Sequence, residues 1–301
     1  MKHHQSGCRR VRLKKRIRRF GQNRVLLGLL SALFVALLPA CRRSHSNKAR
    51  AKSSRLVSAP QQLVPLTAPR KIDKLGLAHF ESASVVIPLG TRWSRPVVVA
   101  IHGNADSPEA DCEAWSAITE NGYFVLCPAL RAASSGDAGT SIPTCASVEC
   151  LADEIREALV ALRKRFGRYV ARNEVVLSGF DNGAARAVPI ALQNPAVFPV
   201  LWLVNGGLKQ WATALSTNYV ERGGKLLGIV CSDVVCESDT LRVEASAQAA
   251  GLKAVVVKPG PLGMTWDPLL TQATRLAFKS SMPMGWPWMV PGRAEHTTSQ
   301  P

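Results

Sequence analysis

Apolar and polar residues alternate along residues 74–281 in a way that predicts strands and helices in turn. Short runs of apolar and β-branched residues are typical of strands buried on both faces of a sheet. We interpret seven runs as strands or as containing one: residues 83–88, 96–102, 123–127, 175–177, 197–204, 225–231 and 253–258. Helical spacing of apolar residues predicts helices at residues 108–121, 151–166, 184–192, 241–250 and 267–279. Alternating strands and helices predict an α/β fold of three layers around a mostly parallel central sheet.

Two further features of this region refine the prediction. In the helix at residues 151–166, Glu154, Glu157, Arg163 and Lys164 are expected to face outward. Residues 131–150 are rich in Gly, Ser and Ala and are expected to form a loop. The gaps between strands leave little or no room for a cap domain.

The first 40 residues have the pattern of an export signal. Residues 1–24 are basic, and residues 25–40 are an uncharged apolar run of 16 residues, which is short for a full membrane span. The run ends in Leu38-Pro39-Ala40-Cys41, which resembles a bacterial lipobox with Cys41 as the lipid acceptor. We therefore expect an exported lipoprotein anchored to a membrane of the cell envelope. An uncleaved signal anchor is the alternative.

The segments on either side of the folded region differ from it in composition. Residues 41–73 are basic and rich in Ser, Ala, Pro and Gln, which predicts a flexible tether near anionic lipid. Residues 282–301 form a C-terminal tail, of which residues 282–289 are rich in Trp and Pro and are expected to pack at the sheet edge. Residues 293–301 are expected to be disordered.

The positive charge belongs to the N-terminal arm. The net charge is +17, and 16 of the 38 Lys and Arg fall within residues 1–58, which hold no acidic residue. The remainder has 22 basic against 21 acidic residues, so the folded region carries no basic signature for nucleic acid. Nucleic-acid binding by the arm alone is a weaker hypothesis than export.

The cysteines favour disulfides. Cys8 belongs to the signal and Cys41 to the lipid site, which leaves an even number in the exported part, as is typical of disulfide-bonded proteins. The simplest of about 15 connectivities joins neighbours: Cys112 with Cys127, Cys145 with Cys150, and Cys231 with Cys236. Free buried thiols remain an alternative. A metal site is disfavoured because the chain has no CxxC motif, and we expect neither metal nor cofactor.

Residues 174–192 contain the motif around which the chain is organised. An apolar run is followed by Gly179-Phe180-Asp181-Asn182-Gly183 and then by a helical segment. A strand, a sharp turn and a helix, with Gly two residues on either side of the central position, is the pattern of a nucleophile elbow. A Cβ at Gly179 or Gly183 would crowd the strand against the helix. Serine usually occupies the centre, where this chain has Asp181.

Three landmarks together resemble the α/β-hydrolase superfamily, in particular secreted polyester depolymerases and feruloyl esterases. They are His102-Gly103-Asn104 after a core strand, the elbow, and Gly263-Met264-Thr265 after the last strand. The resemblance implies an oxyanion hole built from backbone N–H groups at Asn104 and Asn182. It also implies that His102 is a structural residue.

The resemblance implies a triad whose nucleophile and base are both replaced. The acid position falls on Asp233, with Asp239 in reserve; a polar turn beside a disulfide explains either residue equally well. The base position falls on Met264, and His296 is the single histidine downstream of it. A Ser-His-Asp mechanism needs all three groups, so we expect a degenerate site.

Two interpretations of Asp181 remain open. The first is that it caps the following helix, in a protein that binds a small acyl or aromatic ligand in a pocket lined by Trp and apolar residues without catalysis. The second is an active hydrolase acting on an ester, or on an epoxide or alkyl halide with Asp181 as the nucleophile. Haloalkane dehalogenases and epoxide hydrolases of this fold use Asp in a similar elbow. A protein-interaction role for the domain is a third, weaker hypothesis. The sequence does not predict an oligomeric state.

Overall fold

The computed structural model describes residues 62–104, 107–130, 145, 147–211, 213–262 and 265–282. Within them, eight strands form one sheet: β1 (Ile72–Leu75), β2 (Ala83–Val86), β3 (Arg95–Ile101), β4 (Phe124–Cys127), β5 (Val170–Phe180), β6 (Val200–Val204), β7 (Leu226–Val230) and β8 (Lys253–Val257). The helices are α1 (Pro108–Ile118), α2 (Val148–Phe166), α3 (Asn182–Gln193), α4 (Thr213–Glu221), α5 (Val234–Ala249) and α6 (Pro268–Ser281). Two short 3₁₀ turns, η1 (Gly167–Tyr169) and η2 (Leu208–Gln210), complete the described elements.

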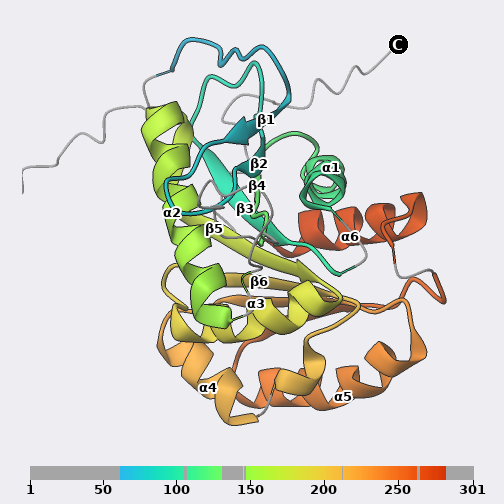
Figure 1. Cartoon of the computed structure of the whole chain (residues 1–301). Coiled ribbons are helices and arrows are strands. Elements are labelled where there is room, and N and C mark those ends of the chain that lie inside the picture. The colour runs from blue at the N-terminus through green and yellow to red at the C-terminus, as the bar shows by residue number, and fades with distance from the viewer. Residues whose placement is uncertain are drawn as a thin grey trace, which may run out of the picture. The chain divides into compact units, whose positions relative to one another are not determined.

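The sheet is mostly parallel, as predicted. Its strand order is β1-β2-β4-β3-β5-β6-β7-β8, and β2 runs antiparallel to both of its neighbours, β1 and β4, whereas all other neighbouring strands are parallel. Residues of α2, α3, α4 and α5 pack on one face of the sheet, whereas α1 and α6 pack on the other, which gives three layers (Figure 1). The core strands are buried on both faces, which explains their continuous apolar runs. No separate cap domain interrupts the described strands and helices.

The carboxyl ends of the parallel strands define one edge of the sheet. In open α/β sheets this edge is where ligands bind, because the loops that follow the strands meet there. The loop after β3, the turn after β5, and the loops after β6 and β7 all leave from this edge. They contain His102, Gly103, Asn104, Asp181 and Asp233, which are candidate site residues.

The ordered domain begins before residue 74, the boundary expected from composition. The backbone of Leu63 and Leu66 donates hydrogen bonds to Arg92 and Thr91, both of 2.8 Å, and the Leu66 side chain is buried. Strand β1 also begins before that boundary, at Ile72, and was not predicted. In β1 only Leu75 is fully buried, so this edge strand lacks the apolar run that marks the others.

Helix α5 begins at Val234, seven residues before its predicted start at residue 241. Val234, Val235 and Leu241 are exposed on this helix, so apolar residues do not mark a single buried face. Its start is set by the Asp233 cap, which the periodicity does not register. The short helix α4 was also missed.

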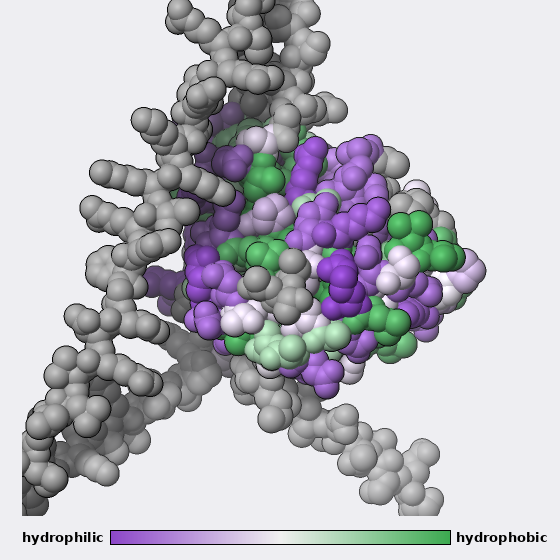
Figure 2. Space-filling view, turned by 90° about the horizontal axis from the view of Figure 1, so that it is seen from below, coloured by the Kyte–Doolittle hydropathy of each residue, from purple (hydrophilic) through white to green (hydrophobic). Residues whose placement is uncertain are grey.

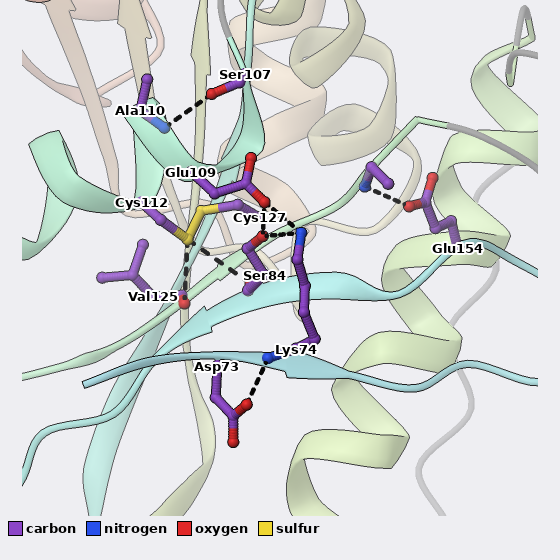
Figure 3. A network of polar contacts seen from close by, with 11 residues as sticks. Asp73, Lys74, Ser84, Ser107, Glu109, Ala110, Cys112, Val125, Cys127 and Glu154 are labelled. Carbon is purple, nitrogen blue, oxygen red and sulfur yellow. Dashed lines mark hydrogen bonds and ion pairs between the residues drawn. A yellow bond between two sulfur atoms is a disulfide. The ribbon is translucent and has the colours of Figure 1, made fainter. Parts of the chain in front are cut away.

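A polar cluster ties β1 and β2 to α1 on the side of the sheet away from the elbow helix. Figure 3 shows Lys74, Ser84 and Glu109 pointing toward one another, close to the disulfide of Cys112 and Cys127. Ser84 donates to Glu109 at 2.8 Å, and Lys74 Nζ forms an ion pair with the same carboxylate. The hydrogen bond from Lys74 is the main reason why the pKa of Glu109 falls to about 2. These contacts fix the edge of the sheet to its neighbouring helix.

The surface seen from below Figure 1, on the side of α4 and α5, carries no continuous apolar face. Apolar residues form separate patches among polar ones in this view (Figure 2).

Three long segments lie outside the described residues: residues 1–61, which include Cys41, the loop at residues 131–144, and the tail from residue 283. Among the described residues, no helix combines the length and apolar character needed to cross a bilayer.

Candidate functional site

The turn between β5 and α3 has the geometry of a nucleophile elbow. Asp181 directly follows β5 and has φ 49° and ψ −118°, a backbone conformation that is strained for any residue with a side chain. A Cβ on Gly179 would lie 2.4 Å from the Gly183 carbonyl oxygen. A Cβ on Gly183 would lie 2.1 Å from the Ile101 carbonyl oxygen. Both glycines are therefore required by close backbone approach. At Gly179 the neighbour is the following helix, as expected, whereas at Gly183 it is the end of β3.

Asp181 occupies the N-cap position of α3 without capping it. Its side chain accepts no capping hydrogen bond, although it directly precedes the helix. At four other helices the cap side chain does accept such a bond: Ser107 at α1, Ser147 at α2, Asp233 at α5 and Asp267 at α6. The capping explanation of Asp181 is therefore wrong, because its side chain makes no hydrogen bond to the helix amides.

The Asp181 side chain leans toward the loop after β3. A Cβ on Gly103 would lie 3.1 Å from Asp181 Cβ and 3.3 Å from its Oδ2. Asn104 follows Gly103 in this loop, and Asn182 opens α3. The fold therefore brings the two segments implied to form an oxyanion hole to the same carboxylate.

A pocket of about 420 Å³ lies beside Asp181. Its lining comes from the ends of β5, β6 and β7: Asp181, Asn182, Ala185, Asn205, Gly206, Gly207, Leu208, Lys209, Gln210, Asp233, Val235, Cys236 and Asp239. Three carboxylates and one lysine dominate the polar part. No aromatic residue belongs to this described lining, in contrast to the expected pocket of Trp and apolar residues. The large Trp side chains Trp115, Trp202 and Trp211 are instead buried in the core.

Both candidates for the acid line this pocket, and each is engaged locally. The Oδ1 atom of Asp233 accepts a hydrogen bond from the backbone N–H of Cys236 at 2.8 Å. Asp239 lies 3.4 Å from the guanidinium of Arg242. Arg242 in turn donates to the carbonyl oxygen of Leu208 at 2.8 Å, and this hydrogen bond holds η2 against α5. Neither carboxylate is hydrogen-bonded to an imidazole within the described residues.

The two histidines among the described residues are committed elsewhere. His79 contacts Glu157 at 3.0 Å, and neither residue belongs to the pocket lining. His102 precedes Gly103, and its Nδ1 donates to the Gly103 carbonyl oxygen at 2.8 Å, while its Nε2 is buried without a partner. Gly263, Met264 and His296, which concern the base position, lie outside the described residues.

Sequence reasoning missed the residues that hold the pocket wall together. Asn205 follows β6 with φ 52°, and its side chain bonds to Ser232 after β7. Asn205 Nδ2 donates to Ser232 Oγ at 2.7 Å, and the Ser232 N–H donates to Asn205 Oδ1 at 2.8 Å. An Asn directly after an apolar run, before Gly206-Gly207, is the signal that could have identified this position. Lys209 and Gln210 were likewise not anticipated.

The cysteines pair with their neighbours, as the simplest connectivity proposed. Disulfides join Cys112 to Cys127, Cys145 to Cys150 and Cys231 to Cys236. The last bond closes the loop that contains Asp233 and borders the pocket through Cys236. It therefore fixes the start of α5 relative to the end of β7.

Glu154 of α2 is buried, contrary to the expectation that it faces outward. Its Oε1 accepts hydrogen bonds from the N–H groups of Ala129 and Leu130 at 2.7 and 3.2 Å, while its Oε2 has no partner. Figure 3 shows this side chain reaching from α2 toward the backbone. Burial raises the pKa of Glu154 to about 7, and the two N–H donors only partly offset that effect. The carboxyl group thus anchors the chain that follows β4.

Comparisons with known proteins bear on the fold. No protein-family profile and no curated protein sequence matches the chain. Among solved structures, it is similar to a dienelactone hydrolase-like promiscuous phosphotriesterase from metagenomic libraries, with a TM-score of 0.52 and 14% identity over 69% of this chain and 95% of that one. It is also similar to an S-formylglutathione hydrolase from Agrobacterium tumefaciens, with a TM-score of 0.50 and 14% identity over 73% of this chain and 98% of that one. Together with the strand order and the elbow, these similarities show that the chain has the α/β-hydrolase fold.

Proposed function

We propose that this protein uses an α/β-hydrolase fold to bind a small ligand at the elbow pocket without turning it over. The observation that carries the proposal is the state of Asp181. Its strained turn matches the place of a nucleophile, yet no described imidazole lines its pocket. A Ser-His-Asp mechanism needs a base to accept and return the proton, and the sequence places Met264 at that position.

The pocket lining suggests the chemistry of the ligand. Asp181, Asp233 and Asp239 face the pocket together with Lys209 and Gln210. The sequence alone favoured an acyl or aromatic ligand. The described lining favours a ligand that also carries hydrogen-bond donors or positive charge, because buried or half-buried carboxylates bind such groups most strongly.

The test is to restore the two missing groups together. The double change Asp181→Ser with Met264→His is expected to create measurable hydrolysis of p-nitrophenyl butyrate, whereas the unchanged protein and each single variant show none. Activity in the unchanged protein would contradict the proposal. A folded double variant with no activity would mean that the hole or the acid is also lost, so folding is checked by circular dichroism.

A second candidate function follows from the unpartnered carboxylate. Among the described residues, nothing donates a hydrogen bond to the Asp181 side chain, which lines the pocket. Such a carboxylate could attack the carbon of an alkyl halide, forming an ester bond as the carbon–halogen bond breaks and halide leaves. Intact-mass analysis after incubation with 1-bromobutane, followed by peptide mapping, tests this step. A stable adduct on Asp181 would show attack without release; halide released over many cycles would show an enzyme.

We also propose that the protein is exported and held to a membrane of the cell envelope by lipid on Cys41. The support is the sequence of residues 1–41, which lie outside the described residues. Metabolic labelling with a palmitate analogue tests the proposal. Label on the chain that is lost in Cys41→Ala is expected, and equal labelling of both proteins would contradict it.

A further inference from the structure

A second cavity lies at the end of the sheet opposite the elbow. It has a volume of about 740 Å³ and is lined by Ser94, Arg163, Gly167, Arg168, Val170, Ala171 and Arg172. Arg172 lies near the start of β5, and Asp181 directly follows its end. At about 3.3 Å per residue, the strand separates the two by roughly 30 Å. The cavity is therefore distinct from the elbow pocket, and we call it the arginine cavity.

Two of the three arginines of this cavity, Arg163 and Arg172, lie close together. The guanidinium of Arg163 donates to the Arg172 carbonyl oxygen at 3.1 Å, and its Nε is buried without a partner. Burial, and then the charge of Arg172, lowers the pKa of Arg163. Arg163 lies in the last turn of α2, where a cation stabilises the helix end, but Arg168 and Arg172 lie beyond that helix. An anion in the cavity would reduce the repulsion and offset the cost of burying the guanidinium charge.

No described carboxylate neutralises these arginines. The ion pairs among the described residues involve other basic side chains: Lys74, His79, Arg156, Arg165, Arg242 and Lys279. Arg165, which neighbours the cavity in sequence, is taken by Asp73. The hydroxyl group of Ser94 adds a further hydrogen-bond donor to the lining. Guanidinium and hydroxyl donors around one cavity suit the oxygens of a phosphate group.

The chain enters the domain beside this cavity. The hydroxyl group of Tyr169, which follows Arg168 in η1, donates to the Val64 carbonyl oxygen at 2.7 Å. Val64 is 76% exposed, although its side chain is apolar. The described start of the chain, which includes Val64, therefore lies at the basic end of the sheet, whereas the elbow pocket lies at the other end.

We propose that the arginine cavity docks the domain onto the phosphate head groups of anionic lipids in the membrane that holds the tether. The inference rests on the proposed membrane anchoring. Arg163, Arg168 and Arg172 bind the phosphates, Val64 enters the interface, and the elbow pocket faces away from the bilayer. Each basic side chain near an anionic surface contributes about 1 kcal/mol, or roughly fivefold in affinity.

Arginine footprinting of the full-length chain tests this docking. The chain is reconstituted in vesicles of phosphatidylcholine alone or with phosphatidylglycerol, treated with phenylglyoxal, and the modification of each arginine is measured by mass spectrometry. Phosphatidylglycerol is expected to slow modification of Arg163, Arg168 and Arg172 about fivefold. Arg156 and Arg275 serve as internal controls and are expected to react equally in both vesicles. A third sample, phosphatidylcholine vesicles with inorganic phosphate, distinguishes a free anion from a lipid surface.

A charge-reversed variant completes the test. In Arg168→Glu with Arg172→Glu, the protection of Arg163 by phosphatidylglycerol is expected to disappear, whereas Arg156→Glu with Lys258→Glu, which changes the net charge equally, is expected to keep it. Equal protection of all arginines, no protection, or protection by inorganic phosphate alone would overturn the docking. Vesicle flotation is scored separately: failure to float on phosphatidylcholine contradicts the anchor, and floating without arginine protection contradicts only the docking.

Discussion

Asp181 and Asp233 each directly precede a helix and line the same pocket, but only Asp233 caps its helix. Asp233 accepts the Cys236 N–H at 2.8 Å from an extended backbone, whereas Asp181 has φ 49° and accepts no capping bond. The same residue type therefore stabilises the fold at one position and costs stability at the other. Strain that persists at a pocket is typical of a functional position.

Glycine at position 181 is expected to stabilise the protein. Asp181→Gly removes the strain of the positive φ and should raise the free energy of unfolding by about 1 kcal/mol, net of the added freedom of the unfolded chain. Asp233→Ala removes the N-cap hydrogen bond of α5 and should lower the free energy of unfolding by about 1 kcal/mol. Urea denaturation of both variants measures the difference. Destabilisation by Asp181→Gly would show that the Asp181 side chain holds the turn.

The elbow should not tolerate a side chain at its second glycine. In Gly183→Ala the new Cβ would lie 2.1 Å from the Ile101 carbonyl oxygen and 2.6 Å from that of His102, both backbone atoms. We expect a loss of about 3 kcal/mol or more in the free energy of unfolding. The matched control is Gly76→Ala, where the Cβ meets nothing within 4 Å, and which should change stability little. Equal effects of the two changes would contradict the tight elbow.

Glu154 makes stability depend on pH near neutrality. Its pKa is raised from 4.5 to about 7 by burial, so the folded state holds the proton more tightly than the unfolded state. The resulting stabilisation is complete below pH 4.5 and is lost as pH rises through 7, by up to about 3 kcal/mol. Denaturation of the unchanged protein and of Glu154→Gln from pH 4.5 to 8 measures this. The free energy of unfolding of the unchanged protein, relative to that of Glu154→Gln, should decline with rising pH. A constant or growing difference would contradict the raised pKa of Glu154.

The disulfides should differ in their effect on stability. Cys112 and Cys127 are separated by 15 residues, whereas Cys145 and Cys150 are separated by 5. A crosslink that closes a longer loop removes more conformational freedom from the unfolded chain. For the loop between Cys112 and Cys127 this stabilises the folded state by about 3 kcal/mol. Replacing both members of each pair with Ala and comparing melting temperatures measures the effect. A larger loss for the Cys145–Cys150 pair would contradict this expectation.

The parts of the fold that are local in sequence could be predicted, and those that depend on tertiary context could not. The glycines around Asp181 and the apolar runs of the core strands identify the elbow and the sheet because each constraint acts within a few residues. Glu154 has the spacing of an outward residue, and only the backbone amides that it meets across the fold explain its burial.

The pocket shows the same distinction. The family resemblance placed Asp233 near the site, at the acid position after a core strand. Its capping bond, the Asn205–Ser232 contact and the contribution of Lys209 depend on how the loops lie together in the fold. The N-cap explanation of Asp181 failed because residue preference carries no information about a backbone already strained by the elbow.

Counting product molecules per chain tests the central claim most directly. Purified full-length protein is incubated with excess p-nitrophenyl butyrate, and released p-nitrophenol is compared with the amount of protein. The proposal that the elbow lacks a base predicts at most one product molecule per chain, and the same result for Asp181→Asn. Product released over many cycles by the unchanged protein, and abolished by Asp181→Asn, would contradict the account.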